Sequence, residues 1–252
     1  MLQGLNPEQR QAVVNTQGPM LVIAGAGSGK TRVLTTRIAY LIKEEGVRPE
    51  NILAFTFTNK AAREMRERVE ALTHEGRHAW IGTFHATGVR ILRREAERLG
   101  YSREFSIYDA DDSRAVIKAV LKKRHADPKE FTPRAVATAI SHFKNQSVKP
   151  AEASERAMTG WEERMAQIYA EYERSLRSNQ AMDFDDLIAR TVELFETHKD
   201  VQERYAERFH YVLVDEFQDT NPLQLILTKA LSAQWENLFA VGDDDQAIYS
   251  WR

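Results

Sequence analysis

The chain has 252 residues, of which 42% are hydrophobic and 29% are charged, and it contains no cysteine. This composition is typical of a globular protein with one large or two ordinary domains, and it excludes disulfides, thiolate metal sites and a cysteine nucleophile. The net charge of −2 excludes a uniformly basic nucleic-acid binder. No segment approaches the roughly 20 apolar residues of a membrane-spanning helix, so we expect a cytoplasmic protein without membrane contact.

The first predicted element is a helix that begins near residue 7. Asn6 is placed as its N-cap, Pro7 lies in its first turn, and Gln9 can close a capping box. A buried strand is predicted over 19–23. It is followed by glycine-rich sequence that ends in Lys30-Thr31 and fits the phosphate-loop pattern G-x-x-x-x-G-K-[ST], except that Ala24 takes the first glycine position.

The residue types of this loop suit a phosphate group. Glycines allow backbone N–H groups to turn inward around phosphate oxygens, Lys30 can reach the β- and γ-phosphates, and the Thr31 hydroxyl can ligate Mg²⁺. A helix follows, because apolar residues recur at helical spacing until Gly46. A glycine-rich turn that binds no nucleotide is the alternative. The candidate phosphate cradle consists of Gly25, Ala26, Gly27, Ser28, Gly29, Lys30 and Thr31.

Two further strands are predicted over 52–57 and 80–85, with a helix over 61–72 between them. Strands that alternate with helices indicate a parallel sheet, in which ligands bind at the carboxyl ends of the strands. From residue 87 to 208 apolar residues recur almost only at helical spacing. We therefore expect a large all-helical insertion over 87–208 that divides the sheet domain into 1–86 and 209–252.

Charge is distributed unevenly along the chain. Residues 86–149 hold 14 Lys and Arg against 8 Asp and Glu, whereas residues 150–216 hold 8 against 16. A basic face of this kind can follow a phosphate backbone. Two ordinary solvated helical faces would give the same counts, so charge alone leaves both interpretations open.

The strands resume at 211–214, and one more is predicted over 238–241. The first of them ends in Asp215 and Glu216. Mg²⁺ requires a carboxylate in or near its shell, and a second carboxylate one residue on can orient or deprotonate an attacking water. Apolar strands often end in acids, so the pair indicates a magnesium site only in combination with the phosphate loop earlier in the chain.

The order of these motifs resembles that of superfamily 1 DNA helicases of the UvrD/PcrA/Rep type. The resemblance extends over the whole chain. It is carried by residues 5–9, 24–32, 55–62, 83–85, 184–187, 215–221 and 242–252.

The resemblance implies an ATP and Mg²⁺ site with assigned roles. Gln9 would read the adenine base, in addition to any capping role, and Arg32 would approach the nucleotide. Asp215 and Thr31 would hold Mg²⁺, and Glu216 would act on the water. Gln218 and Gln246 would sense the γ-phosphate, although Gln246 is also explained as a loop glutamine bonded to backbone. Arg37 is expected on a solvated or ion-paired face.

The resemblance also implies a groove for single-stranded DNA. Its residues combine donors for phosphate with aromatic faces for bases. Thr58 or Asn59 is also the expected N-cap of the next helix, and His85 alone would more simply be a packed histidine. The residues implied are Phe57, Thr58, Asn59, Lys60, Thr83, Phe84, His85, Tyr249, Trp251 and Arg252.

The expected fold is therefore α/β, a RecA-like P-loop NTPase sheet with a helical insertion, and without the second RecA-like domain that family members have. The expected function is the N-terminal half of an ATP-dependent 3′→5′ helicase, weakly active or inactive alone. Expected partners are single-stranded DNA, DNA junctions, the missing C-terminal domains and DNA-repair proteins, in a nucleoid-associated cytoplasmic setting. A non-catalytic nucleotide-binding, single-strand-binding or partner-binding module is the alternative.

Overall fold

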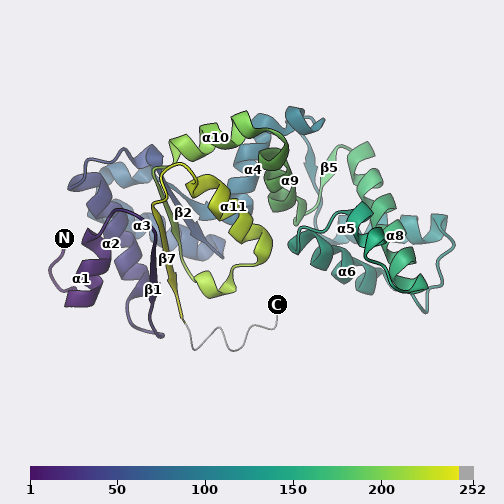
Figure 1. The fold of residues 1–252 in the computed structure, drawn as a ribbon, viewed down its shortest axis with the longest axis horizontal. Helices are drawn as coiled ribbons and strands as arrows, with labels where there is room; N and C mark the ends of the chain where they lie inside the picture. The colour runs from purple at the N-terminus through teal and green to yellow at the C-terminus, as the bar shows by residue number, and fades with distance from the viewer. Residues whose placement is uncertain (244–252) are drawn as a thin grey trace. The chain divides into compact units, whose positions relative to one another are not determined.

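The computed structural model describes residues 1–243. Figure 1 shows an α/β fold with a central sheet and many helices. Its strands are β1 (Met20–Ile23), β2 (Ile52–Thr56), β3 (Trp80–Thr83), β4 (Ser106–Ile107), β5 (Ala181–Met182), β6 (Tyr211–Val214) and β7 (Leu238–Gly242). Its helices are α1 (Pro7–Val14), α2 (Lys30–Lys43), α3 (Asn59–Leu72), α4 (Phe84–Glu95), α5 (Ala110–Lys123), α6 (Pro133–Asn145), α7 (Pro150–Glu155), α8 (Gly160–Ser178), α9 (Asp186–Thr197), α10 (Lys199–Arg208) and α11 (Pro222–Ser232).

The chain forms two compact units. Among the described residues, the sheet unit contains 1–87, 198–220 and 224–243, and the helical unit contains 88–197 and 221–223. Helix α10 thus belongs to the sheet unit, whereas the sequence placed it in the insertion. Helical spacing shows that a segment is a helix, but it carries no information on which core the helix packs against.

Within residues 1–243 the sheet has five parallel strands in the order β1-β7-β6-β2-β3. Helices α2 and α3 lie on one side of it and α11 on the other (Figure 1). The strands end nearly level, because Ile23 pairs with Gly242, Phe55 with Val214, and Thr56 with Thr83. Parallel pairing therefore brings the loops that follow these strands to one edge of the sheet.

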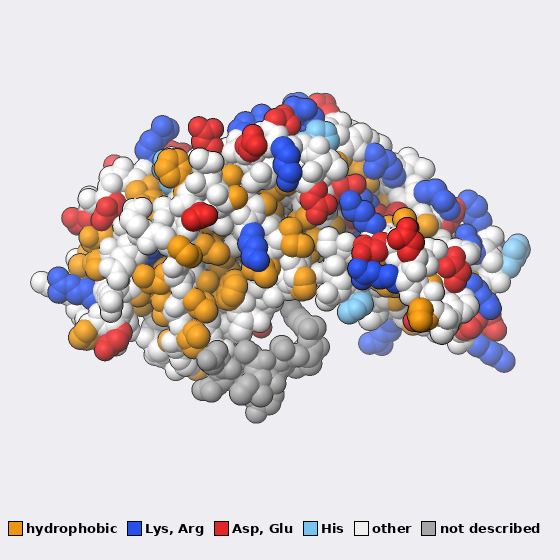
Figure 2. All heavy atoms as spheres, viewed as in Figure 1, with side chains coloured by type: hydrophobic (Ala, Val, Ile, Leu, Met, Phe, Trp, Pro, Cys, Tyr) orange, Lys and Arg blue, Asp and Glu red, His pale blue; other side chains and the backbone are white. Residues whose placement is uncertain are grey.

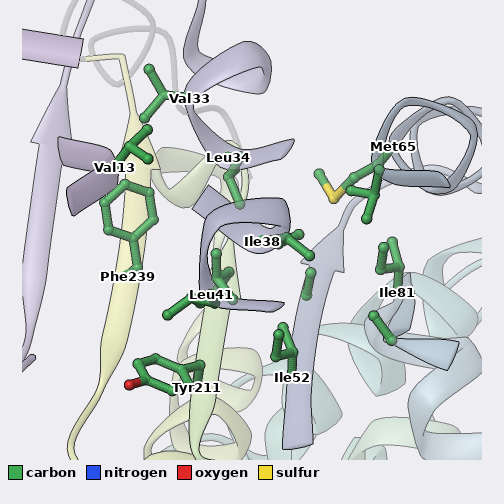
Figure 3. Close-up of a cluster of buried hydrophobic side chains, with 14 of the residues drawn as sticks. Val13, Val33, Leu34, Ile38, Leu41, Ile52, Met65, Ile81, Tyr211 and Phe239 are labelled. Carbon is green, nitrogen blue, oxygen red and sulfur yellow. The ribbon is translucent and has the colours of Figure 1, made fainter. Parts of the chain in front are cut away.

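One core lies between this sheet and helices α1 to α3. Figure 3 shows side chains of α2, among them Leu34, Ile38 and Leu41, pointing toward Ile52 and Phe239 of the strands. All five side chains are at most 1% exposed. The predicted capping box of α1 is confirmed, since Asn6 and Gln9 exchange hydrogen bonds between side chain and backbone.

Strand β1 is an edge strand, and the expectation that it is buried was wrong. Leu21 and Ile23 are 55% and 54% exposed, and β1 pairs only with β7 within residues 1–243. Figure 2 shows apolar side chains gathered on the face of the sheet unit that carries β1 and α11. A short apolar run predicts a strand, but it does not tell whether the strand has neighbours on both sides.

The helical unit is not entirely helical, so that expectation needs correction. Its two short strands, β4 and β5, form a parallel pair in which Ser106 lies opposite Ala181 and Ile107 opposite Met182. Two-residue strands leave no periodic pattern that sequence analysis can detect. Within residues 1–243, no helix combines the length and apolarity that crossing a membrane requires.

A buried group of charges lies in the helical unit. Lys144 of α6 is 1% exposed in its side chain and is within 2.9 Å of carboxylate oxygens of Glu173, Asp183 and Asp186. Burial alone would lower the pKa of Lys144, but these carboxylates more than reverse that effect and raise it. Arg190 adds a second cation beside Glu173 and Asp186. The group joins α6, α8 and α9 at the turn that holds residues 184–187.

Candidate nucleotide and nucleic-acid site

Among residues 1–243, several of those predicted for nucleotide and DNA lie where strands end, along one edge of the sheet. The phosphate loop follows β1, Asp243 follows β7, and Asp215 and Glu216 follow β6. In the next two strands, the predicted DNA residues 57–60 follow β2, and residues 83–85 lie at the end of β3 and the start of α4. The strand order therefore places the two sets side by side, each on adjacent strands of the same edge.

The phosphate loop leads into α2 without a side chain that caps the helix. Gly27 and Gly29 have positive φ values of 76° and 87°, which glycine adopts without strain. Gly29 is the N-cap of α2, and no side-chain cap hydrogen bond is present there. The first N–H groups of a 14-residue helix thus remain available at its positive end. This arrangement fits an anion such as a phosphate.

Lys30 is held in this loop by oxygen atoms. Its Nζ donates to the carbonyl oxygens of Ala24 at 2.8 Å and Gly25 at 3.3 Å, and to Asp243 Oδ2 at 2.9 Å. The ion pair is buried, with side chains 8% and 2% exposed. The loop therefore holds the Lys30 ammonium group beside the N-terminus of α2, paired with the Asp243 carboxylate.

Gln218 connects the Lys30–Asp243 pair with Glu216. Its Oε1 accepts a hydrogen bond from the Asp243 backbone N–H at 3.0 Å, and its Nε2 donates to Glu216 Oε2 at 2.9 Å. Gly242 lies close to the same amide, since a Cβ there would be 3.2 Å from Gln218 Oε1. A continuous polar connection thus runs from Glu216 to Lys30.

Asp215 and Glu216 occupy unusual environments. Glu216 has φ 49° and ψ 49°, a left-handed conformation that is uncommon for a residue other than glycine. Asp215 is 5% exposed. Burial and the neighbouring Glu216 raise the pKa of Asp215 to about 6, against the opposing effects of the Glu216 N–H, Lys30 and Arg68. A strained residue beside a buried carboxyl is typical of functional sites.

The raised pKa of Asp215 predicts a pH-dependent stability. The folded carboxyl binds its proton more tightly than the unfolded one, so stability falls as pH rises from about 4 through about 6. The fall due to this group is up to about 3 kcal/mol. We expect Asp215→Asn to remove this part of the pH dependence in urea unfolding in metal-free buffer, whereas the exposed Asp219→Asn retains it. Equal pH slopes for wild type and Asp215→Asn would contradict this explanation.

Gln9 lies against the phosphate loop. Its Nε2 donates to the Ser28 carbonyl oxygen at 2.8 Å, and its Oε1 accepts from the Asn6 N–H at 3.0 Å. A Cβ at Gly29 would be 3.1 Å from the same Nε2. Gln9 therefore has both its capping role and a place beside the loop. Arg32 is exposed, and its Nη2 lies beside Gly4, 2.9 Å from where a Cβ would be.

The predicted DNA residues of β2 and β3 differ in exposure. Phe57 is half-buried, and Thr58, Asn59 and Lys60 are exposed at the start of α3. Phe84 is 1% exposed. Its ring stacks on Phe55 at 4.1 Å between centroids and meets Phe57 edge-on at 5.6 Å. Phe84 thus supports Phe57, which presents the more accessible ring.

Both threonines of this set have structural hydrogen bonds. Thr58 caps α3 by accepting from the Ala61 N–H at 3.1 Å, as the sequence predicts. Thr83 is buried and accepts from the Ala86 N–H at 3.1 Å. His85 is half-buried in the first turn of α4. The predicted residues Gln246, Tyr249, Trp251 and Arg252 lie outside the described residues.

Two residues of the sheet unit have roles that the sequence did not predict. Asp243 belongs to the motif segment 242–252 without a predicted role of its own, although it is an acid directly after a strand, the same signal that identified Asp215. Arg37 was expected on a solvated or ion-paired face, and it is 1% exposed. Its position on the apolar face of α2 was the available signal, since Leu34 precedes it by three residues and Leu41 follows it by four.

A divalent cation here would have few protein ligands. Residues 1–243 bring together no group of three or more His, Asp or Glu side chains that could hold a metal ion. Mg²⁺ is commonly bound by one or two protein oxygens together with phosphate oxygens of the nucleotide. The buried carboxyl of Asp215 and the hydroxyl of Thr31, on the first turn of α2, fit that pattern.

Comparison with known proteins gives a uniform result. Residues 5–252 match the family model described as the UvrD/REP helicase N-terminal domain. The chain is 52% identical to the ATP-dependent DNA helicase PcrA of Bacillus subtilis, with 100% of this chain and 34% of that protein covered. It is 51% identical to PcrA of Staphylococcus aureus and 50% to PcrA of Staphylococcus epidermidis, with 35% of each covered. The chain thus spans about a third of the length of these curated relatives.

Proposed function

Because the chain belongs to the UvrD/REP helicase family, we propose that it is the first motor portion of an ATP-dependent DNA helicase. The observation that carries the proposal is the polar connection from Glu216 through Gln218 and Asp243 to Lys30. It joins the carboxylate that would act on water to the ammonium that would contact phosphate. A turn that bound no nucleotide would not need these groups in one hydrogen-bonded network.

The phosphates of ATP would lie at the N-terminus of α2. Backbone N–H groups of the loop and Lys30 would hold them, Arg32 would approach them from the first turn, and Gln9 would meet the adenine. Asp215 and Thr31 would hold Mg²⁺, which neutralises charge on the phosphate oxygens when bound. Asp243 would stay beside Lys30 and keep its ammonium oriented.

Hydrolysis would depend on Glu216. Its carboxylate would orient and deprotonate the attacking water as a general base. Gln218 donates to this carboxylate and accepts from Asp243, so it would register the loss of the γ-phosphate through either neighbour. Gln246 would act with it on the γ-phosphate side.

Single-stranded DNA would bind along the part of the edge formed by β2 and β3. Phe57 would stack on a base, with Phe84 behind it, while Thr58, Asn59, Lys60, Thr83 and His85 would supply donors to phosphate. Tyr249, Trp251 and Arg252 would extend the groove. We propose movement in the 3′→5′ direction, DNA junctions and DNA-repair proteins as partners, and a nucleoid-associated cytoplasmic location, all from family likeness.

We propose further that ATP turnover needs the part of the relatives that this chain does not cover, about two thirds of their length. A second RecA-like domain would close the cleft and supply arginine to the transition state, a contribution of roughly 10³–10⁵ in related phosphoryl transfer. The chain alone would then bind nucleotide weakly, hydrolyse it poorly and not unwind DNA.

The rate of ATP hydrolysis with and without single-stranded DNA tests this function, on the chain alone and with the C-terminal part supplied. We expect stimulation by DNA in the second case. Phe57→Ala should raise the DNA concentration for half-maximal stimulation roughly tenfold through lost stacking. Trp235→Ala, an exposed aromatic before β7 at the opposite edge, is the matched control. If DNA stimulates ATP hydrolysis in neither preparation, the motor proposal fails and the protein is better described as a non-catalytic binding module.

A further inference from the structure

Arg37 is one of the largest fully buried side chains of the protein, and its hydrogen bonds go to backbone oxygens. Its Nη1 donates to the carbonyl oxygens of Ala12 and Asn15, both at 2.7 Å, and more weakly to Val13 at 3.4 Å. Its guanidinium carbon lies 4.3 Å from the centre of the Phe239 ring. Burial lowers the pKa of Arg37 to about 10, so the group keeps its charge at neutral pH.

The oxygens that Arg37 contacts belong to the end of α1. The last carbonyl groups of a helix have no partner within it, and a cation there is favoured by the helix dipole. Helix α1 has eight residues, and only Ala12 and Val13 are buried. A helix of this length is not stable alone, so its position depends on the few groups that attach it to α2 and β7. Figure 3 shows Val13 beside Phe239.

The same helix carries Gln9. Gln9 and Val13 are four residues apart and lie on one face of α1. Gln9 Nε2 reaches the Ser28 oxygen of the phosphate loop from this face, while Arg37 holds the helix one turn further on. The position of Gln9 beside the loop is thus fixed by its own hydrogen bond to Ser28 and by the hydrogen bonds of Arg37 to the C-terminal end of α1.

We propose that Arg37 is a positioning residue for base selection: by holding the C-terminal end of α1 against α2 and Phe239, it places the Gln9 amide where it meets the base of the nucleotide. The inference rests on the proposed function, in which Gln9 contacts adenine. Arg37 itself is 1% exposed and points to backbone oxygens of residues 12–15, so it would touch neither phosphate nor base. Its loss should therefore affect the choice between bases and leave the binding of a triphosphate group unchanged.

The experiment is competition binding, in which ATP, GTP and inorganic tripolyphosphate displace a fluorescent ADP analogue from the protein. We expect Arg37→Met to lower the preference for ATP over GTP about tenfold, the size of one lost hydrogen bond to a base. Affinity for tripolyphosphate should stay within about twofold. Arg37→Lys, which retains a charged donor, should restore part of the preference. Combined with Gln9→Ala, Arg37→Met should have no further effect, because both act through one amide.

Leu41→Ala is the matched control, since it destabilises the same core one turn along α2 without touching α1 oxygens. It should leave the preference unchanged, which separates positioning from a loss of stability. If Arg37→Met does not fold, Phe239→Leu, which removes the ring beside the guanidinium, should lower the preference in its place.

An ATP-to-GTP preference that stays at the wild-type value in folded Arg37→Met, or in Phe239→Leu where Arg37→Met does not fold, overturns the inference. If Gln9→Ala removes the preference and the Arg37 variants do not, only the inference falls. If Gln9→Ala itself changes nothing, the role of Gln9 in the proposed function falls, and the inference falls with it.

Discussion

Glu216→Gln is expected to lower the rate of ATP hydrolysis by about 10²–10⁴, the usual contribution of a positioned general base. The amide has the shape of the carboxylate, and its oxygen can still accept the hydrogen bond from Gln218 Nε2. ATP binding should therefore be retained, because Lys30 and the phosphate loop are unchanged. The measurement is steady-state hydrolysis with the C-terminal part supplied, together with calorimetric ATP binding.

Glu236→Gln is the matched control for this variant. Glu236 also has a positive φ, 56° against 49° for Glu216, but it is exposed in the turn between α11 and β7. Its substitution should change neither rate nor affinity. If Glu216→Gln hydrolyses ATP at the wild-type rate, another group activates the water. If both variants lose activity alike, the effect comes from the backbone conformation and not from the carboxylate.

Lys144→Met is expected to destabilise the helical unit by about 3–5 kcal/mol, the usual effect of removing one partner from a buried ion pair. Three carboxylates of Glu173, Asp183 and Asp186 would then share a buried site with Arg190 alone. Trp161, the one tryptophan between residues 88 and 197, can report urea unfolding of this unit by its fluorescence.

The loss should be smaller at low pH. Burial and Asp186 already raise the pKa of Asp183 to about 6, and removal of Lys144 takes away the group that opposes this rise. The folded state then binds more protons than the unfolded state, so the variant gains stability relative to wild type as pH falls. Lys149→Met is the control, since this lysine is 57% exposed and its pair with Glu196 contributes about 0–1 kcal/mol. Equal losses for both variants would show that the buried group is not needed for stability.

The sequence was sufficient for the parts of the site that follow strands. Strand, loop and helix over 20–43 place Lys30 and Thr31, and the strand that ends in Asp215 places the carboxylates on the same edge. The parallel pairing of β2 with β6 and β3 confirms the parallel sheet predicted from the alternation of strands and helices. These features depend on local patterns and on one rule of parallel sheets, so a single sequence reveals them.

The rest depends on contacts between distant segments. The pairing of Lys30 with Asp243 joins residues 213 positions apart, and the burial of Arg37 depends on where α1 ends. The exposure of β1 depends on strand order, which a single apolar run cannot show. The unit to which α10 belongs depends on its packing partner in the same way. Such facts become visible only when the tertiary structure is known, because residue type and spacing leave them open.

The most direct test of a nucleotide site at this edge of the sheet is calorimetric binding of ATP with Mg²⁺ to the wild-type protein, to Lys30→Ala and to Lys43→Ala. Lys43 is an exposed lysine in the last turn of the same helix. We expect wild type and Lys43→Ala to bind alike. Lys30→Ala should lose roughly 10- to 150-fold in affinity, the size of a charge-assisted hydrogen bond to phosphate, and thermal melting should confirm that it remains folded. Unchanged affinity in folded Lys30→Ala would contradict the claim that this edge of the sheet is a nucleotide site.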